Sequence, residues 1–169
     1  KQLVLTIGIA LLTSIGFAQK GNVTNAAMAY QDYEKSLMGQ DLEQATKDII
    51  EAKKYIDLAC AHPDTKENPK ALMYKGKIYF GYAGASEMSE DKTSFEGVDL
   101  EKLAEDGFNA LVKSKEVDSK GRYSDDVDAY ANQIRSMSAN QGIAAYEKKE
   151  YESAMGALLG AAKFGEILG

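Results

Sequence analysis

An apolar stripe with helical spacing constrains the fold of this chain more than any other feature. The stripe contains six residues that step by three and four: Leu42, Ala45, Ile49, Ala52, Ile56 and Ala59. This spacing places all six side chains on one face of an α-helix. After residue 19, strand signals are nearly absent, because no stretch alternates apolar and polar residues for long. The sequence therefore predicts an all-α fold.

Short breaks divide the rest of the chain into further helices. Gly39 and Gln40 interrupt the first helix, and Pro63 ends the second because its ring and missing N–H bar continuation. Asn68 and Pro69 then provide an N-cap and a first helical residue. We expect three antiparallel helix pairs, at about residues 22–61, 69–117 and 125–165.

A polar, acidic stretch interrupts the middle pair. Residues 84–99 read GASEMSEDKTSFEGVD and contain five acidic residues and one lysine, Lys92. Charge runs of this kind are usually solvated. We therefore expect a long, solvated loop over residues 84–99.

Composition excludes several classes of protein. Hydrophobic residues make up 44% of the 169-residue chain and charged residues 27%, which is typical of a globular protein. The 20 basic and 26 acidic residues give a net charge of −6. This charge argues against nucleic acid and anionic membranes as partners, because both attract basic surfaces. One cysteine excludes an intramolecular disulfide, and one cysteine with one histidine excludes the common zinc ligand sets.

The first 18 residues have the pattern of a secretory signal peptide. Lys1 precedes an uncharged run with an apolar centre at residues 3–12, and the small residues Gly16 and Ala18 indicate cleavage after Ala18. A retained membrane anchor is the alternative, but the run is short for a span and polar residues dilute it. We expect an exported protein, periplasmic or secreted, with no stable membrane insertion after cleavage.

The last helix pair has a pattern of small and large residues. A small residue and an aromatic in the first helix precede an Ala–large–Ala order in the second: Gly142, Tyr146, Tyr151, Ala154, Leu158 and Ala161. This pattern resembles a tetratricopeptide repeat. The middle pair has comparable residues, whereas the first helix of the first pair matches poorly. The resemblance covers about residues 22–165 and implies helix pairs stacked as an α-solenoid.

The repeats depart from the tetratricopeptide period of about 34 residues. The equivalent alanines are Ala45, Ala104 and Ala154, so the acidic loop and a lengthened or broken helix before Gly142 would have to account for the excess. A generic helical bundle is the alternative, since small and large residues alternate there too. With the signal peptide, the degenerate repeats resemble exported tetratricopeptide proteins of Bacteroidota. The apolar final helix lacks a polar cap, so we expect the N-terminal part of a longer chain.

The resemblance implies a non-enzymatic scaffold that binds another protein or peptide. In the family, the first helix of each pair lines the binding groove, and the matching positions are Met73, Lys77, Phe80, Ile143, Tyr146 and Glu147. A glycan- or nutrient-binding partner of an outer-membrane uptake system is one alternative. The N-terminal module of a longer enzyme is another. The oligomeric state stays open.

No arrangement of reactive side chains predicts catalysis, a cofactor or a metal. Cys60 and His62 are two residues apart, which points their side chains to different faces of a helix. Residues 116–127 superficially resemble a calcium loop, but Lys120 and Val127 occupy positions that require oxygen ligands. We expect Cys60 to be packed and residues 116–127 to connect two helices.

Overall fold

The computed structural model describes residues 21–169, and every regular element in that range is helical. The all-α prediction is therefore confirmed, and neighbouring helices pack in pairs. The chain divides into two compact units after residue 117. The predicted signal peptide at residues 1–18 lies outside the described residues.

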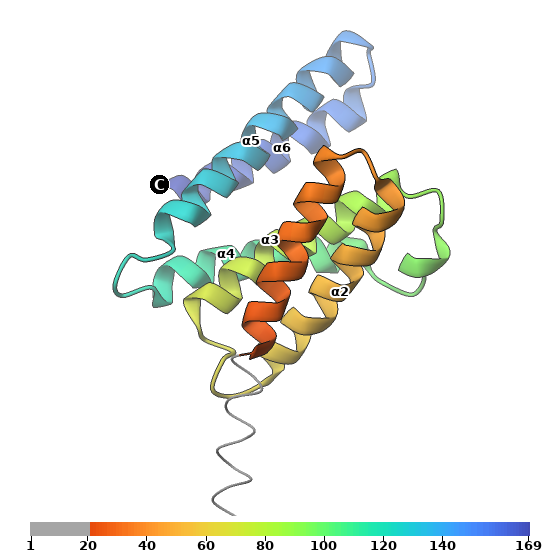
Figure 1. The fold of residues 1–169 in the computed structure, drawn as a ribbon. Coiled ribbons are helices and arrows are strands. Elements are labelled where there is room, and N and C mark those ends of the chain that lie inside the picture. The colour runs from red at the N-terminus through yellow and green to blue at the C-terminus, as the bar shows by residue number, and fades with distance from the viewer. Residues whose placement is uncertain (1–20) are drawn as a thin grey trace, which may run out of the picture. The chain divides into compact units, whose positions relative to one another are not determined.

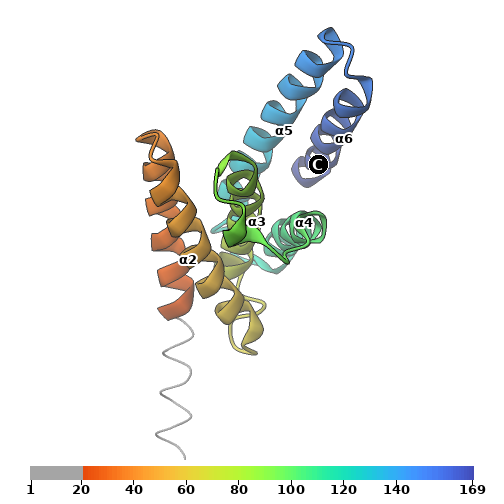
Figure 2. The ribbon, with the colours of Figure 1, turned by 90° about the vertical axis from the view of Figure 1, so that its right-hand side faces the viewer.

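The described part of the N-terminal unit contains four α-helices. They span residues 21–38, α2 (Leu42–Ala61), α3 (Pro69–Met88) and α4 (Leu100–Val117), with a short 3₁₀ helix η1 (Thr93–Phe95) before the last. The first of them lies beside α2, and α3 lies beside α4, in both views (Figures 1 and 2). α2 also packs against α3, so the four helices form one continuous arrangement.

The predicted breaks coincide with capped helix ends. The Asp41 carboxylate accepts a hydrogen bond from the Gln44 amide at 3.0 Å, and the Asn68 side chain accepts one from the Ala71 amide at 3.2 Å. Both bonds satisfy amides that have no partner within their own helix. Gln40, at φ 59°, provides the left-handed residue of the turn between the first two helices.

The apolar stripe of α2 forms the centre of the N-terminal unit. Its last five members, from Ala45 to Ala59, are buried, whereas Leu42 at the start of the helix is half-exposed. A Cβ built on Gly81 of α3 would meet Ile49 Cδ1 at 3.0 Å and the Tyr33 ring at 3.0 Å. The Tyr33 hydroxyl donates to the Gly81 carbonyl at 3.1 Å. Gly81 therefore lets α3 close over the crossing between the first two helices.

The loop predicted over residues 84–99 is shorter than expected: residues 84–88 belong to α3, whereas residues 89–99 connect α3 to α4 with most side chains exposed. α3 continues through Met88, and Phe95 of η1 is buried, with its ring 4.9 Å from the Tyr82 ring. The Lys92 ammonium donates to the Ser86 and Glu87 carbonyls at 2.7 and 3.0 Å, which satisfies the C-terminal end of α3. One apolar anchor and one cationic cap thus hold an acidic sequence in place.

The C-terminal unit is an antiparallel hairpin of α5 (Ser124–Glu147) and α6 (Tyr151–Leu168) (Figure 1). α5 is unbroken, so of the two alternatives expected before Gly142 the helix is lengthened and not broken. Asp118 caps it, because its carboxylate accepts hydrogen bonds from the Tyr123 and Ser124 amides at 2.7 and 3.1 Å. These donors lower the pKa of Asp118. Residues 116–127 therefore make a helix connection.

The α3–α4 and α5–α6 pairs share one crossing geometry. A Cβ on Gly76 would collide with Leu111 and lie 2.9 Å from the Gly107 carbonyl oxygen. A Cβ on Gly142 would lie 2.7 Å from Leu158 Cγ and 3.2 Å from the Ala154 carbonyl oxygen. In each pair, a glycine of the first helix faces a leucine, and the carbonyl belongs to the residue four positions before that leucine.

This geometry corrects the sequence register of the middle pair. The small–large–small order along the second helices is Gly107, Leu111, Ser114 in α4 and Ala154, Leu158, Ala161 in α6. Ala104, the alanine expected at the crossing, is only half-buried one turn earlier. Ser114 is fully buried and donates to the Pro69 carbonyl at 2.8 Å. The second small position of α4 is therefore occupied by a polar residue.

Candidate functional site

The three groove residues predicted on α3 have little surface to offer. Met73 is buried at 3% exposure, and Lys77 and Phe80 are partly buried. The Phe80 ring packs toward α4, since a Cβ on Gly107 would lie 3.4 Å from it. These side chains contribute first to the interior of the N-terminal unit.

The three groove residues predicted on α5 are exposed together near its C-terminal end. Ile143 is 54% and Tyr146 63% exposed, and Glu147 is also exposed. The Tyr146 ring contacts the Tyr151 ring edge to face, with centroids 5.6 Å apart and planes at 64°. This pair bridges the two helices of the hairpin at its turn, and it orients the Tyr146 ring.

An apolar hollow of about 410 Å³ lies beside this aromatic pair. It is lined by six residues of the hairpin: Tyr146, Tyr151, Ala154, Met155, Leu158 and Leu159. All but Ala154 are exposed. The hairpin thus presents an apolar surface on one side while it buries Ala161, Phe164 and Ile167 on another.

Leu158 distinguishes this hairpin from the N-terminal unit. Ile49 and Leu111 each follow the small residue of their helix by four positions, and both are fully buried. Leu158 occupies the same position after Ala154 but is 43% exposed. The sequence analysis named Leu158 as the large residue of the repeat pattern and did not identify Met155 or Leu159. The signal it missed was that α6 carries more apolar residues than one packed face requires.

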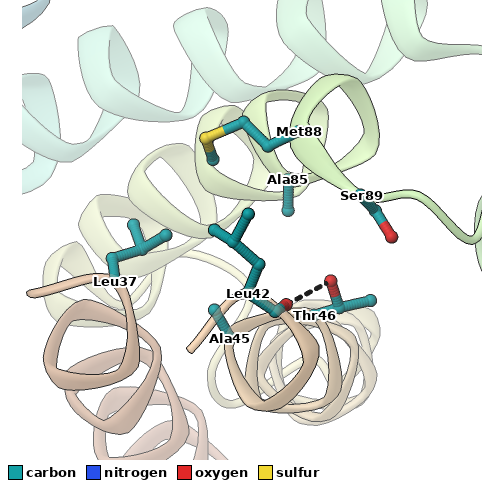
Figure 3. A pocket seen from close by; sticks show the side chains of 7 residues that line it. All are labelled: Leu37, Leu42, Ala45, Thr46, Ala85, Met88 and Ser89. Atoms are coloured by element: carbon teal, nitrogen blue, oxygen red, sulfur yellow. Dashed lines mark hydrogen bonds between the residues drawn. The ribbon is translucent and has the colours of Figure 1, made fainter. Parts of the chain in front are cut away.

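A crevice where three helices of the N-terminal unit meet is filled by its own side chains. Figure 3 shows Leu37 from the first helix, Leu42 and Ala45 from α2, and Ala85 and Met88 from α3. They leave no room for a water molecule. The Thr46 hydroxyl nearby donates to the Leu42 carbonyl at 2.9 Å, which satisfies it within α2. This place offers no binding site.

A larger hollow of about 510 Å³ lies between α2 and the segment after α3. Three of the four charged side chains in its lining have partners: Lys47 donates to Glu43 at 2.6 Å, and the Asp91 carboxylate accepts from the Thr93 amide at 2.9 Å. The hydrogen bonds from Thr93 lower the pKa of Asp91. The bonds from Thr93 and Ser94 to Asp91 therefore hold the start of η1 in place.

The two reactive side chains that the sequence analysis considered, Cys60 and His62, have structural roles. Burial raises the pKa of the Cys60 thiol to about 11, which disfavours the thiolate that a nucleophile needs. His62 Nδ1 accepts a hydrogen bond from the Asp64 amide at 3.2 Å at the end of α2. Among residues 21–169, no group of three or more His, Cys, Asp or Glu side chains could hold a metal ion.

A charged network lies between α2 and α3. Asp57 accepts hydrogen bonds from the Tyr79 hydroxyl and from the Lys53 ammonium, both at 2.7 Å. Burial and the Asp57 carboxylate raise the pKa of Tyr79. Lys53 and Lys75 lie over the Tyr79 ring, at 5.5 and 5.2 Å from its centroid. Each polar group of the network has a partner, so the network joins the two helices.

Comparison with known proteins gives no assignment: no family model, curated protein or solved structure matches this chain. A search of the described helices for a membrane span finds none that is both long and apolar enough.

Proposed function

We propose that this chain is an exported, non-enzymatic interaction module of the tetratricopeptide type, which binds another protein or peptide through the apolar hollow of its C-terminal hairpin. The observation that carries the proposal is the exposed Tyr146–Tyr151 pair beside a half-exposed Leu158. Tyrosines are enriched among the residues that dominate binding at protein interfaces.

The chemistry of the hollow favours a protein ligand. Its lining offers aromatic and aliphatic side chains and no charged group. A small polar ligand would need several converging hydrogen-bond donors or acceptors, whereas an apolar side chain of a partner needs only such a surface. Contiguous apolar patches of this kind mark interaction sites on soluble proteins.

The repeated helix crossing supports the tetratricopeptide part of the proposal. The two closest helix pairs place glycine against leucine in the same register, as expected for structural repeats that diverged in sequence. Of the predicted groove residues on α5, Tyr146 lines the hollow, and Ile143 and Glu147 are exposed within three residues of it in sequence. Met73, Lys77 and Phe80 take a supporting role.

Site-specific photo-crosslinking tests the proposal. A photoreactive phenylalanine in place of Tyr146 should crosslink one defined protein in the producing cell, and the same residue in place of Leu58, exposed on α2, should not. The captured protein is then titrated against wild type and Tyr146→Ala. A partner that crosslinks equally from both positions, or binds Tyr146→Ala normally, would contradict the proposal.

A further inference from the structure

A hollow on the N-terminal unit combines apolar side chains with an acidic edge. It is the hollow of about 510 Å³ between α2 and the segment after α3. Its apolar lining comes from Leu42 and Ile50 of α2 and from Met88 at the end of α3. Leu42 is 44% and Met88 46% exposed, and Figure 3 shows the Leu42 side chain pointing from α2 toward α3. We call this place the acidic hollow.

Negative charge is in excess in the lining of the acidic hollow. The lining holds three carboxylates and one ammonium: Glu43, Glu90, Asp91 and Lys47. Lys47 pairs with Glu43 at 2.6 Å, and neither Glu90 nor Asp91 has an ion pair with a described residue. Lys92, the next residue along the chain, donates instead to two carbonyls at the end of α3. Two carboxylates next to the apolar side chains therefore have no cation partner among residues 21–169.

The shape of the acidic hollow favours a peptide segment over a small molecule. A small ligand is usually buried over most of its surface in its pocket, whereas this hollow is bordered by exposed side chains on both sides, Glu43 on α2 and Glu90 after α3. Along α2, the lining recurs at Leu42, Thr46 and Ile50, which span about 12 Å. An extended chain covers this length with about four residues.

We propose that the acidic hollow binds a short segment of another protein in which apolar side chains are flanked by lysine or arginine. The apolar side chains of the segment cover Leu42, Ile50 and Met88, and its cations pair with Glu90 and Asp91. Charge complementarity of this kind selects one partner over others and speeds association. The acidic hollow shares no lining residue with the hollow of the hairpin, so the basic segment and the partner of the proposed function use separate surfaces.

Titration of the isotope-labelled chain with three synthetic peptides of equal length, followed by NMR, tests this proposal. One peptide alternates leucine with lysine, the second leucine with glutamate, and the third serine with lysine. The leucine–lysine peptide should shift the amide signals of residues 42–50 and 88–94. It should bind there at least about 10-fold more tightly than either of the others, because only this peptide offers both the apolar side chains and the cations.

Charge variants of the acidic hollow make the test specific. Glu90→Lys should weaken binding of the leucine–lysine peptide about 10-fold, since it replaces an attraction with a repulsion. Lys47→Glu removes the one cation of the lining and should strengthen binding about 3-fold. Glu96→Lys is the matched control: Glu96 is exposed in the same segment but outside the lining, so affinity should stay within about 2-fold of wild type. Circular dichroism checks that each variant keeps its helices.

A truncation tests the apolar half of the acidic hollow. Met88→Ala should weaken binding of the leucine–lysine peptide about 5-fold, because it removes apolar contact area. Met38→Ala is the control, since Met38 is 85% exposed and lies outside the lining, and it should leave the affinity unchanged.

Four results would overturn the proposal: equal binding of all three peptides, equal effects of Glu90→Lys and Glu96→Lys, no effect of Met88→Ala, or shifts confined to the hairpin. Hexylammonium, which has one apolar chain and one charge, provides a further comparison. If it saturates the same shifts at the same concentration as the leucine–lysine peptide, the site takes a small amphiphilic cation and the peptide proposal fails. The proposed function is read separately, from the crosslink at Tyr146, and Tyr146→Ala should bind the leucine–lysine peptide at the acidic hollow as wild type does.

Discussion

Gly142 of α5 lies against Leu158 of α6, so that a Cβ on the glycine would come within 2.7 Å of the leucine Cγ. Gly76 of α3 and Leu111 of α4 repeat this relationship. The difference lies in the leucine: Leu111 is fully buried, whereas Leu158 is 43% exposed. The same crossing therefore forms an interior in the N-terminal unit and an open surface in the C-terminal hairpin.

Gly76→Ala should destabilise the protein, although alanine is the better helix former. The new methyl group would meet buried Leu111 and the Gly107 carbonyl, neither of which has free space. We expect a loss of about 1–3 kcal/mol in the free energy of unfolding, measured by urea denaturation.

Gly84→Ala provides the matched control in the same helix. Nothing lies within 4 Å of a Cβ at Gly84, so its substitution should stabilise the protein by up to about 1 kcal/mol through helix propensity. Equal effects of the two variants would show that the α3–α4 crossing is not as close as described here.

The same crossing shows what the sequence could and could not predict. Spacing located the helices well, because apolar periodicity and the cap at Asn68 are local signals. It misplaced the register of α4, because Ala104 and Leu111 fit an apolar stripe as well as Gly107 and Leu111 do. Only the position of α3 decides which small residue faces it.

Phe95→Ala should destabilise the segment that was predicted to be solvated. Phe95 is buried against Tyr82 and is the apolar anchor of η1. We expect a loss of about 3 kcal/mol, measured by urea denaturation. Met88→Ala, which removes a half-exposed side chain nearby, is the control and should cost far less. A loss from Phe95→Ala no larger than that from Met88→Ala would indicate a loosely attached segment.

This segment also shows the limit of a charge count. Residues 84–99 contain five acidic residues and one aromatic, so their average composition predicts a solvated segment. The structure depends instead on single contacts, Phe95 on Tyr82 and Lys92 on the end of α3. The sequence showed that the final helix is apolar, but it did not separate the buried side chains of α6 from exposed ones such as Met155 and Leu159.

Alkaline pH should destabilise the N-terminal unit through Tyr33. Burial raises the pKa of Tyr33 to about 12, from an ordinary value of 10.0. A raised folded-state pKa means that stability is fully present below pH 10 and is lost as the pH rises toward 12. Tyr33→Phe should therefore flatten the fall in unfolding free energy between pH 10 and 12. At pH 8 the variant should show only the loss of the hydrogen bond to Gly81, and an unchanged slope above pH 10 would refute the assignment.

Cys60 should react slowly in the native protein. Its pKa, raised to about 11 by burial, leaves little thiolate at pH 8. We expect a thiol reagent to label native protein at least about 10-fold more slowly than urea-unfolded protein. Labelling at equal rates would mean that the end of α2 opens readily. The chain has one cysteine, so no second thiol complicates the measurement.

Tyr146→Ala and Phe80→Ala should separate binding from stability. Both were predicted to line a groove, but Tyr146 is 63% exposed and Phe80 is partly buried against α4. Tyr146→Ala should cost about 2 kcal/mol or more in affinity for the crosslinked partner and leave the melting temperature almost unchanged. Phe80→Ala should lower the melting temperature and affect affinity little once the variant is folded. Titration calorimetry and thermal denaturation of both variants give the comparison. If Phe80→Ala weakens binding as much as Tyr146→Ala at full folding, the partner contacts α3 directly, and the hollow of the hairpin is not the main binding surface.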